Sequence, residues 1–255
     1  MKKSIKFGAV ALALAVAAPA FAENADVEVE NEYEAIGWTP IAVSLASPVQ
    51  LPWGSHTWDV FGLNLGILWS DTPKMYGLGF GTIAMANRDD LFGLGLTACC
   101  NWNTTNVYGM RVTPGANIAF GTIYGVDIGA FSYRPGEMWG WDTEFLGNYG
   151  SKFWGLQIGG LINLTTEQSY GCSIAVGGNM AKVAYGCQVA AVFNFTDELH
   201  GCQLAGVFNY SDELHGAQIG IVNFAKECPW GFQIGLVNII MENVIPVLPI
   251  VNASF

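Results

Sequence analysis

The chain has 255 residues, of which 12% are charged, 13% are aromatic and 32 are glycine. A soluble globular domain usually carries about 25% charged residues, so much of this surface is not solvated by charge. The net charge of −11 excludes the basic footprint of nucleic-acid-binding proteins, and no nucleic-acid partner is expected. No apolar run after the N-terminal leader is long enough to predict a membrane-spanning helix.

Residues 1–22 have the pattern of a cleaved secretory signal peptide. Lys2, Lys3 and Lys6 precede an apolar run over residues 7–18, and Ala20-Phe21-Ala22 provides a small-x-small cleavage site. Cleavage after Ala22 leaves seven of the ten basic residues against 21 acidic ones, a net charge of −14. We expect an exported protein with an acidic N-terminal segment over residues 23–40 and a single repeat-built β-domain over residues 41–255.

His56 lies in a tryptophan-rich stretch that precedes the first clear repeat. Ser55 is its neighbour, but adjacent residues of a strand point to opposite faces. A nucleophile and its base must lie within hydrogen-bond reach of each other. We therefore predict no catalytic residues here and a protein that is not an enzyme.

A unit of about fifteen residues recurs from Gly62 to Gly231, which predicts a repeat architecture. The interval between Gly125 and Gly155 leaves room for one degenerate copy near Gly140. The register near Gly109 stays open, because Gly115-Ala-Asn-Ile-Ala also fits the pattern. The other copies begin at Gly62, Gly77, Gly93, Gly125, Gly155, Gly171, Gly186, Gly201 and Gly216.

Each unit alternates with a period of two residues, which predicts a β-strand. In the unit at Gly201, one face carries His200, Cys202, Leu204, Phe208 and Tyr210, whereas Gln203, Ala205 and Asn209 lie on the other. One face is therefore apolar with aromatic ends, and the other is small with glutamine or asparagine. Turn segments such as Thr196-Asp-Glu-Leu connect successive strands.

The chain departs from the repeat consensus between Arg134 and Phe153. Two interpretations fit this segment: an extracellular ligand-contacting loop and a degenerate pair of strands, of which we favour the second. The residues that raise the question are four aromatics and two acids: Trp139, Trp141, Tyr149, Trp154, Asp142 and Glu144.

The remaining polar candidates have simple interpretations. His200 and His215 share one repeat position, so we interpret them as repeat-encoded side chains. Zinc-site spacing is absent, and Cys172, Cys187 and Cys202 fill one small apolar position, which a solenoid would stack at about 4.8 Å. We expect turn acids to be solvated rather than to bind cations. These acids are Asp197, Glu198, Asp212 and Glu213, and neither a metal nor a cofactor is predicted.

Two architectures satisfy the pattern, and we favour an all-β, antiparallel outer-membrane β-barrel of about 12–14 short strands. Aromatic residues at both ends of an apolar face suit the two membrane interfaces. The barrel would contact the lipid bilayer of the outer membrane, either as a small-solute channel or as a surface structural protein. The repeat glutamines would line its lumen: Gln157, Gln188, Gln203, Gln218 and Gln233.

The alternative is a β-solenoid with one coil per repeat, in which the apolar face forms the core and the glutamines form an exposed ladder. Neighbouring units share nearly identical turns, as translation by one coil predicts. Prolines near both ends of the domain, such as Pro48 and Pro249, are typical sheet terminators. This solenoid would be periplasmic or surface-exposed and would act as an interaction module for an unidentified surface partner.

The sequence resembles a family of exported bacterial surface-repeat proteins of uncharacterised function. The repeat Gly-x-Gln-Ile-Gly-Leu-Val-Asn is nearest at residues 231–238, and Pro48-Val-Gln-Leu and Asp59-Val-Phe-Gly-Leu match the family's opening segments. Leu248-Pro-Ile-Val-Asn matches its closing segment. The resemblance covers most of the mature chain and implies a surface or outer-membrane location, without implying an activity.

Overall fold

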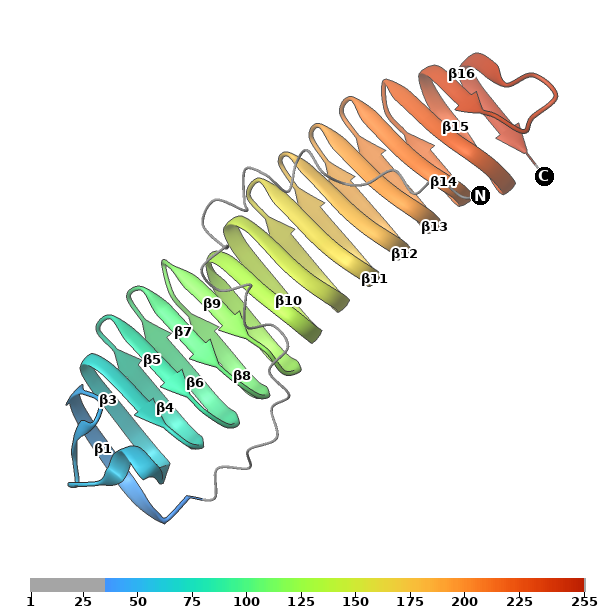
Figure 1. The fold of residues 1–255 in the computed structure, drawn as a ribbon. Coiled ribbons are helices and arrows are strands. Elements are labelled where there is room, and N and C mark those ends of the chain that lie inside the picture. Colours follow the sequence, from blue (N-terminus) through green and yellow to red (C-terminus); the bar gives the residue numbers. More distant parts are fainter. Residues whose placement is uncertain (1–34, 255) are drawn as a thin grey trace, which may run out of the picture. The chain divides into compact units, whose positions relative to one another are not determined.

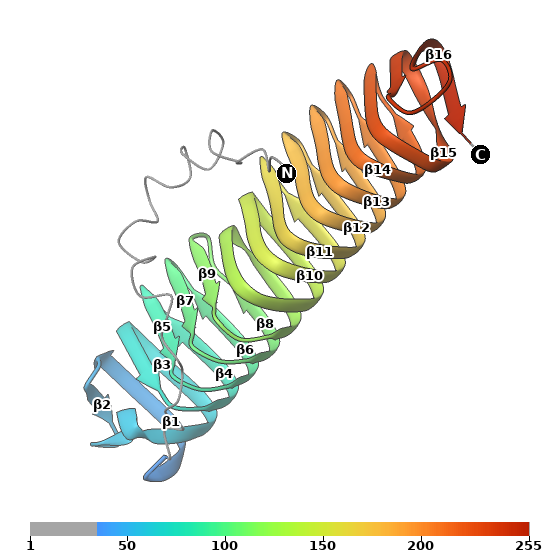
Figure 2. The same ribbon diagram turned by 45° about the vertical axis from the view of Figure 1, so that its right-hand side comes forward.

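Residues 35–254 are described by a computed structural model, and the predicted signal peptide lies outside them. These residues form a stack of β-coils that follow one another along a single axis, with one short 3-10 turn, η2 (Ser55–Thr57), near the start. Figures 1 and 2 show the coils from two directions. The protein is therefore a β-solenoid, with one coil per repeat.

The strands form one sixteen-stranded sheet that winds through all coils. From β4 to β9 each coil contains two short strands, whereas β3 and the strands from residue 123 onward run continuously through both layers. The strands are β1 (Gly37–Ala46), β2 (Val49–Leu51), β3 (Trp58–Thr72), β4 (Met75–Gly81), β5 (Ala84–Asn87), β6 (Leu91–Thr97), β7 (Cys100–Asn103), β8 (Val107–Val112), β9 (Ala116–Ala119), β10 (Ile123–Gly159), β11 (Ile162–Ala175), β12 (Gly178–Ala190), β13 (Phe193–Ala205), β14 (Phe208–Ile219), β15 (Val222–Ile240) and β16 (Val247–Ser254).

Neighbouring coils pair in parallel and in the register of the repeat. Gly186 lies opposite Gly201, and Cys187 lies opposite Cys202. The prediction of an antiparallel barrel with transmembrane strands is wrong, because consecutive repeats run in the same direction. The sheet also does not close, since β1 pairs only with β2 and β3, and β16 pairs only with β15. The prediction of a small-solute channel is therefore wrong as well.

Each coil folds back on itself, so that two strand layers face each other. The long layer contains β4, β6 and β8 with the residues aligned to them; the short layer contains β5, β7 and β9 with theirs. One turn leads from the long layer to the short layer, for example at Gly206-Val207, and a second leads on to the next coil near Asp212-Glu213. Hydrogen bonds from Gln203 to Thr196 (2.7 Å) and to the Tyr210 carbonyl (3.3 Å) join the layers across the core.

One glycine at the same place in every coil sets the repeat. Twelve register glycines run from Gly62 to Gly231, and eleven of them have φ between +116° and +151°. At Gly201, a Cβ atom would lie 2.0 Å from the carbonyl oxygen of Gly186 on the preceding coil. Only glycine adopts this backbone without strain, so the glycine fixes both the conformation and the close approach of coils. Gly140 is the degenerate copy expected from the spacing, and Gly109 rather than Gly115 has the register conformation.

The core is polar over most of its width, which reverses the prediction for a solenoid. The Asn209 side chain is fully buried, whereas Leu204 is 36% exposed on the outside of the same coil. Buried apolar residues form a narrow row two positions before the register glycine. This row contains Val60, Met75, Leu91, Val107, Ile123, Met138, Phe153, Ala184, Leu199 and Leu214.

Asparagines in the short layer hold the coils together from inside. The amide of Asn194 donates to the Asn209 oxygen (3.0 Å), and Asn209 donates in turn to Asn223 (2.8 Å). Each amide also donates to a backbone carbonyl, as Asn209 does to Ile219 (2.8 Å). Because an amide has both donors and an acceptor, each asparagine of this row from Asn163 to Asn223 accepts from one neighbour and donates to the next, as in the asparagine ladders of stacked sheets.

The two ends of the stack differ from its body. At the start, β2 runs antiparallel to β1, and at the end β16 runs antiparallel to β15. Pro249 lies in the edge strand β16, where it removes a donor from the open edge. In the part of the chain that the structure describes, we find no helix of the length and apolarity that crossing a membrane requires.

Candidate interaction surface

The turn from the long to the short layer forms a row of exposed aliphatic side chains, here called the aliphatic corner. Leu161, Val176, Val207 and Leu236 expose between 46% and 70% of their surface. Alternation along the long layer adds two further outward positions in each coil, because the intervening residues point into the core. Outward members of the C-terminal coils at these positions include Leu156, Ile158, Ile174, Val189, Leu204, Ile219, Phe232 and Ile234.

A continuous aromatic row borders this surface on the long layer, immediately before each register glycine. Ring centroids of successive members lie 4.2 to 6.4 Å apart in stacked geometry. In-register parallel pairing brings the rings face to face, because identical positions repeat at the strand spacing. The first aromatic row contains Phe61, Tyr76, Phe92, Tyr108, Tyr124, Trp139, Trp154, Tyr170, Tyr185, His200 and His215.

A second, less regular aromatic row lies at the end of the short layer. The rings of Phe195, Tyr210 and Phe224 stack at 4.2 and 5.2 Å, and those of Tyr133 and Tyr149 stack at 5.3 Å. These side chains are half-buried and point outward. The outer surface between the two aromatic rows, with the aliphatic corner in its middle, is called the apolar band below.

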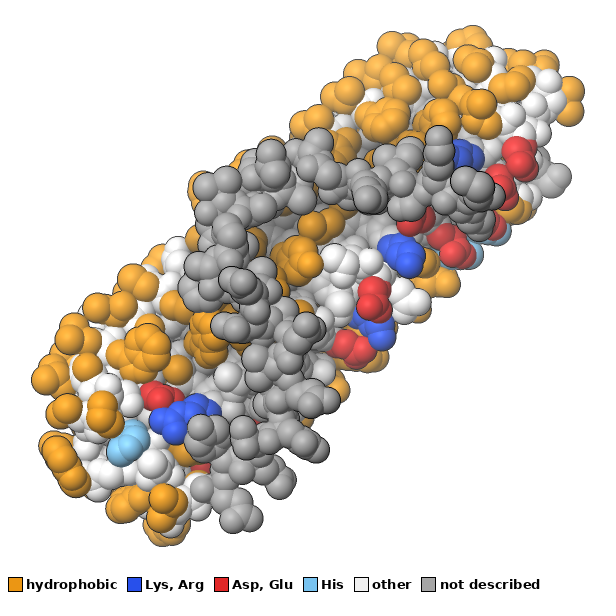
Figure 3. All heavy atoms as spheres, in the orientation of Figure 1, with side chains coloured by type: hydrophobic (Ala, Val, Ile, Leu, Met, Phe, Trp, Pro, Cys, Tyr) orange, Lys and Arg blue, Asp and Glu red, His pale blue; other side chains and the backbone are white. Residues whose placement is uncertain are grey.

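Charged side chains gather at the opposite turn, from the short layer to the next coil, here called the charged corner. Ion pairs join neighbouring coils there, such as Lys74 to Asp89 (3.1 Å) and Lys226 to Asp212 (2.5 Å). Among residues 35–254, every charged side chain outside the core lies in or beside this corner, and none lies on the apolar band. Figure 3 shows the charged groups along the lower right side of the coils and hydrophobic side chains gathered along the upper left side.

The glutamines singled out in the sequence lie inside the solenoid and not on its surface. Gln203 donates to Gln188 (3.0 Å), Gln218 donates to Gln203 (2.9 Å), and Gln233 donates to Gln218 (2.7 Å). Gln157 is buried at the same repeat position, but Ser173 occupies that position in the next coil and interrupts the ladder. These residues join coils and are not accessible to a partner.

The histidines belong to the charged and aromatic rows. His200 and His215 stack on each other at 4.6 Å, and their Nε2 atoms lie 2.6 and 2.7 Å from the carboxylates of Glu198 and Glu213. His56 lies in η2, far along the chain from that pair, and Ser55 beside it is buried. The structure does not bring a histidine, a nucleophile and an orienting acid together among these residues.

Three cysteines face outward on adjacent coils of the apolar band. Cys172 lies opposite Cys187, and Cys187 opposite Cys202, in direct register. All six cysteines have free thiols. Burial raises the pKa of the Cys172, Cys187 and Cys202 thiols, which keeps them protonated and apolar at neutral pH.

In the described part of the chain, no three His, Cys, Asp or Glu side chains are grouped to hold a metal ion.

The irregular segment after Arg134 is strand throughout, within β10. Trp139 and Trp154 continue the first aromatic row, so the interpretation as an extracellular loop is wrong. Asp142 and Glu144 point into the core, where they belong to a buried charge cluster of Arg111, Asp127, Arg134, Asp142 and Glu144.

Two ion pairs form the centre of the buried charge cluster. Arg111 binds Asp127 through two hydrogen bonds of 2.9 and 2.5 Å, and Arg134 binds Asp142. Burial raises the pKa of Glu144 to about 9, with Asp142 and Asp127 adding to the effect, so this carboxyl is protonated at neutral pH. Burial likewise raises the pKa of Asp142 to about 6, against the effect of Arg134. Arg111, Asp127 and Asp142 lie two residues after a register glycine, at the repeat position of the glutamines. The sequence therefore already indicates that these charged residues share the position of the glutamine ladder.

Comparison of the chain with protein-family models, with curated proteins and with solved structures finds no match in any of the three.

Proposed function

We propose that the protein is an exported, repeat-built interaction module that binds a partner through its apolar band and has no catalytic role. The observation that carries this proposal is the distribution of outward side chains: charged groups outside the core lie in or beside one corner, and mainly apolar side chains cover the band between the two aromatic rows. Monomeric soluble proteins rarely expose contiguous apolar patches above a few hundred Å². A surface of this kind is covered when the protein functions.

The buried polar side chains of the core bond to one another and stabilise the stack of coils. They are therefore not available to a substrate, which supports a binding role. The amides join coils, and the two arginines of the buried charge cluster pair with Asp127 and Asp142 inside the core. Two hollows on the described surface are shallow and lined mainly by apolar residues and glycine. Enzymes place convergent polar groups in a pocket, and these hollows lack them.

The leader over residues 1–22 supports export, and the resemblance to surface-repeat proteins supports a location at the cell surface or the outer membrane. A rigid rod also suits this role. Because each coil contacts only its neighbours, a solenoid presents one long binding surface whose length scales with the number of repeats.

Thiol labelling in intact cells tests the proposal. In a background with the six cysteines replaced by alanine, Val207→Cys places one thiol on the aliphatic corner, and Asp197→Cys places a matched thiol on the charged corner of the preceding coil. We expect a polar maleimide to label the corner thiol at position 207 at least about tenfold more slowly in cells, equivalent to about 1.4 kcal/mol of protection. After purification the two variants should react alike, and equal rates in cells would rule out a covered band.

A further inference from the structure

We propose that the partner of the apolar band is a lipid bilayer, on which the solenoid lies with its axis parallel to the membrane plane. The aliphatic corner inserts among the acyl chains, the aromatic rows lie at the level of the head groups, and the charged corner faces water. This inference rests on the proposed function, since it names the partner of the same surface.

The order of side chains around a coil carries the inference. Starting at Glu198 on the charged corner, the coil passes His200 in the first aromatic row, Leu204, and Val207 on the aliphatic corner. It then reaches Tyr210 in the second aromatic row before the next charged corner. Aromatic side chains with one polar edge favour the membrane–water interface, and aliphatic ones favour the acyl region. The coil therefore repeats the polarity profile of one bilayer leaflet twice, once on each side of the aliphatic corner.

The size of the band fits a surface rather than a single ligand. Twelve coils at a spacing of about 4.8 Å give a length of about 58 Å. Amphipathic elements that lie in a membrane interface bury their apolar face by about 5–10 Å. The corner residues Leu161 and Leu236 are 57% and 70% exposed, so they can contact acyl chains without a change in the backbone.

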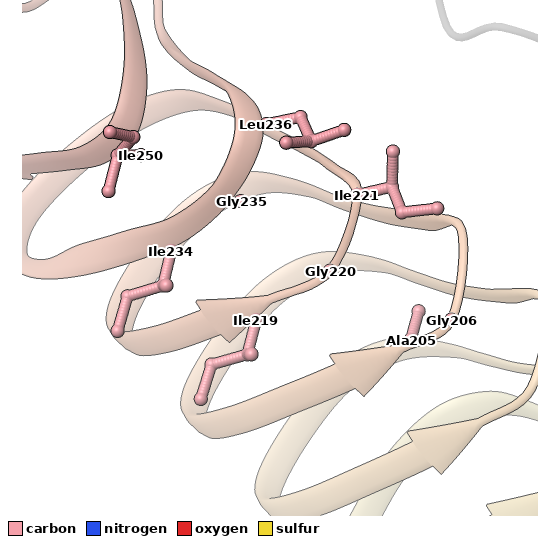
Figure 4. Close-up of a pocket in the computed structure, with 9 residues that line it drawn as sticks. All are labelled: Ala205, Gly206, Ile219, Gly220, Ile221, Ile234, Gly235, Leu236 and Ile250. Carbon is pink, nitrogen blue, oxygen red and sulfur yellow. The ribbon is translucent and has the colours of Figure 1, made fainter.

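A shallow groove near the C-terminal end of the band has a lining that suits an acyl chain better than a polar ligand. It has a volume of about 470 Å³ and is bordered by Ile219, Ile221, Ile234 and Leu236, with glycines at its base. Figure 4 shows these side chains spread along the outer edge of successive coils. The groove offers no charged or hydrogen-bonding side chain to orient a polar ligand, whereas the methylene groups of acyl chains require none.

A second copy of the chain fits the band less well. A two-fold dimer joins two identical rigid patches, and a flat contact on the long layer would leave the aliphatic corner and the short layer exposed. The band wraps around a convex turn, from Leu204 through Val207 to Tyr210. A fluid bilayer covers such a surface, because lipids rearrange around it.

The charge distribution selects the type of lipid. Acidic residues outnumber basic ones at the charged corner, so Coulomb attraction to anionic head groups does not drive binding. We expect binding to vesicles of phosphatidylethanolamine and phosphatidylcholine that persists in high salt. Added phosphatidylglycerol should weaken it.

The test is vesicle flotation with the full exported chain and two matched triple variants. The band variant carries Val192→Lys, Val207→Lys and Ile221→Lys, and the control carries Asp197→Lys, Glu227→Lys and Glu242→Lys at the charged corner. All six side chains lie outside the core, so both variants should keep the β-sheet circular dichroism of the parent. We expect at least about a tenfold loss of vesicle partitioning for the band variant and none for the control.

Tryptophan quenching by brominated lipids measures how deep the aromatic rows lie in the bilayer. Trp139 and Trp154 of the first aromatic row should be quenched most by bromine near the head group. A parent chain that stays soluble with vesicles, or equal partitioning of the two variants, overturns the lipid inference. If the thiol at position 207 is nevertheless protected in cells and sedimentation shows a dimer, the partner is a second copy and the proposed interaction module stands. If neither occurs, both proposals fail.

Discussion

The central coils and the C-terminal coils solve the same packing problem with different chemistry. In the C-terminal coils, the row two residues after the register glycine holds Gln188, Gln203, Gln218 and Gln233, each bonded to its equivalent in the next coil. In the central coils, the same row holds Arg111, Asp127 and Asp142.

The difference shows what a translational stack requires of a buried side chain. An amide donates to the copy above and accepts from the copy below, so repetition satisfies it. A charged group cannot pair with its own copy, because like charges at strand spacing repel. In the central coils Arg111 pairs with Asp127, and the neighbouring acid Asp142 pairs with a further cation, Arg134, from the short layer. Repetition is lost there, which is why the sequence departs from its consensus.

The largest expected effect is loss of one partner from a central ion pair. Arg111→Met leaves Asp127 buried without its cation, and we expect a loss of about 3–5 kcal/mol in the free energy of unfolding. Adding Asp127→Leu should restore most of it, because a neutral pair has no charge to bury. Arg88→Met at the charged corner is the control, because the pair of Arg88 with Asp71 is partly exposed to water and is screened more than the fully buried pair of Arg111 with Asp127. Urea denaturation measures all four, and an equal loss for Arg88 and Arg111 would show that the core cluster is screened by water.

Substitution of a register glycine should cost the same free energy of unfolding in the central and in the C-terminal coils. The two regions would then differ only in the buried row two residues after that glycine. Gly125→Ala and Gly201→Ala each place a Cβ atom within 2.0 Å of a carbonyl oxygen at φ of +151° and +141°. We expect each to cost about 3 kcal/mol, at the upper end of the range for backbone strain. Cys202→Ala, one residue from Gly201, should change little. Hydrogen exchange should show the loosening centred on the substituted coil, and a large difference between the two glycines would contradict a common backbone.

A smaller loss is expected in the amide ladder of the C-terminal coils. Asn209→Leu removes the acceptor for Asn194 and the donor to Asn223. A buried polar group left without a partner costs about 1–3 kcal/mol, so the loss should stay below that of Arg111→Met. Thermal unfolding checks the magnitude, and the outward Phe208→Leu in the same strand is the control. A loss as large as that at Arg111 would show that the ladder acts as one cooperative unit.

The sequence predicts the strands, the fifteen-residue period and the register glycine at Gly140, because alternation and glycine spacing are local properties. It does not predict which face of the strand lies inside. Burial of the apolar face is the usual expectation, and aromatic side chains at both of its ends favoured a barrel in lipid. The polar face of Gln203 and Asn209 lies inside because stacking gives each amide a partner, and that depends on parallel pairing of neighbouring coils. Parallel pairing is not encoded in any single repeat.

The buried charge cluster should also give the solenoid a pH-dependent stability that the amide ladders cannot provide. The pKa of Glu144 is raised from 4.5 to about 9 in the folded chain. Between these values the folded state binds a proton that the unfolded state has released, so stability falls as pH rises across this window, by at most about 1.4 kcal/mol per pH unit. Asp142, with its pKa raised to about 6, acts in the same direction at lower pH.

Glu144→Gln keeps the hydrogen bond that Asn117 donates to the side-chain oxygen (3.2 Å) and removes the titration. The variant and the parent should therefore be of similar stability near pH 5, and the variant should gain about 1 kcal/mol over the parent for each pH unit as the pH rises from 5 to 8. The difference in stability between the two chains removes every pH dependence that both share. Parallel stability curves from pH 5 to 9 would show that Glu144 is ionised in the folded chain. In that case the three carboxylates of the cluster would outnumber its two guanidinium groups inside the core.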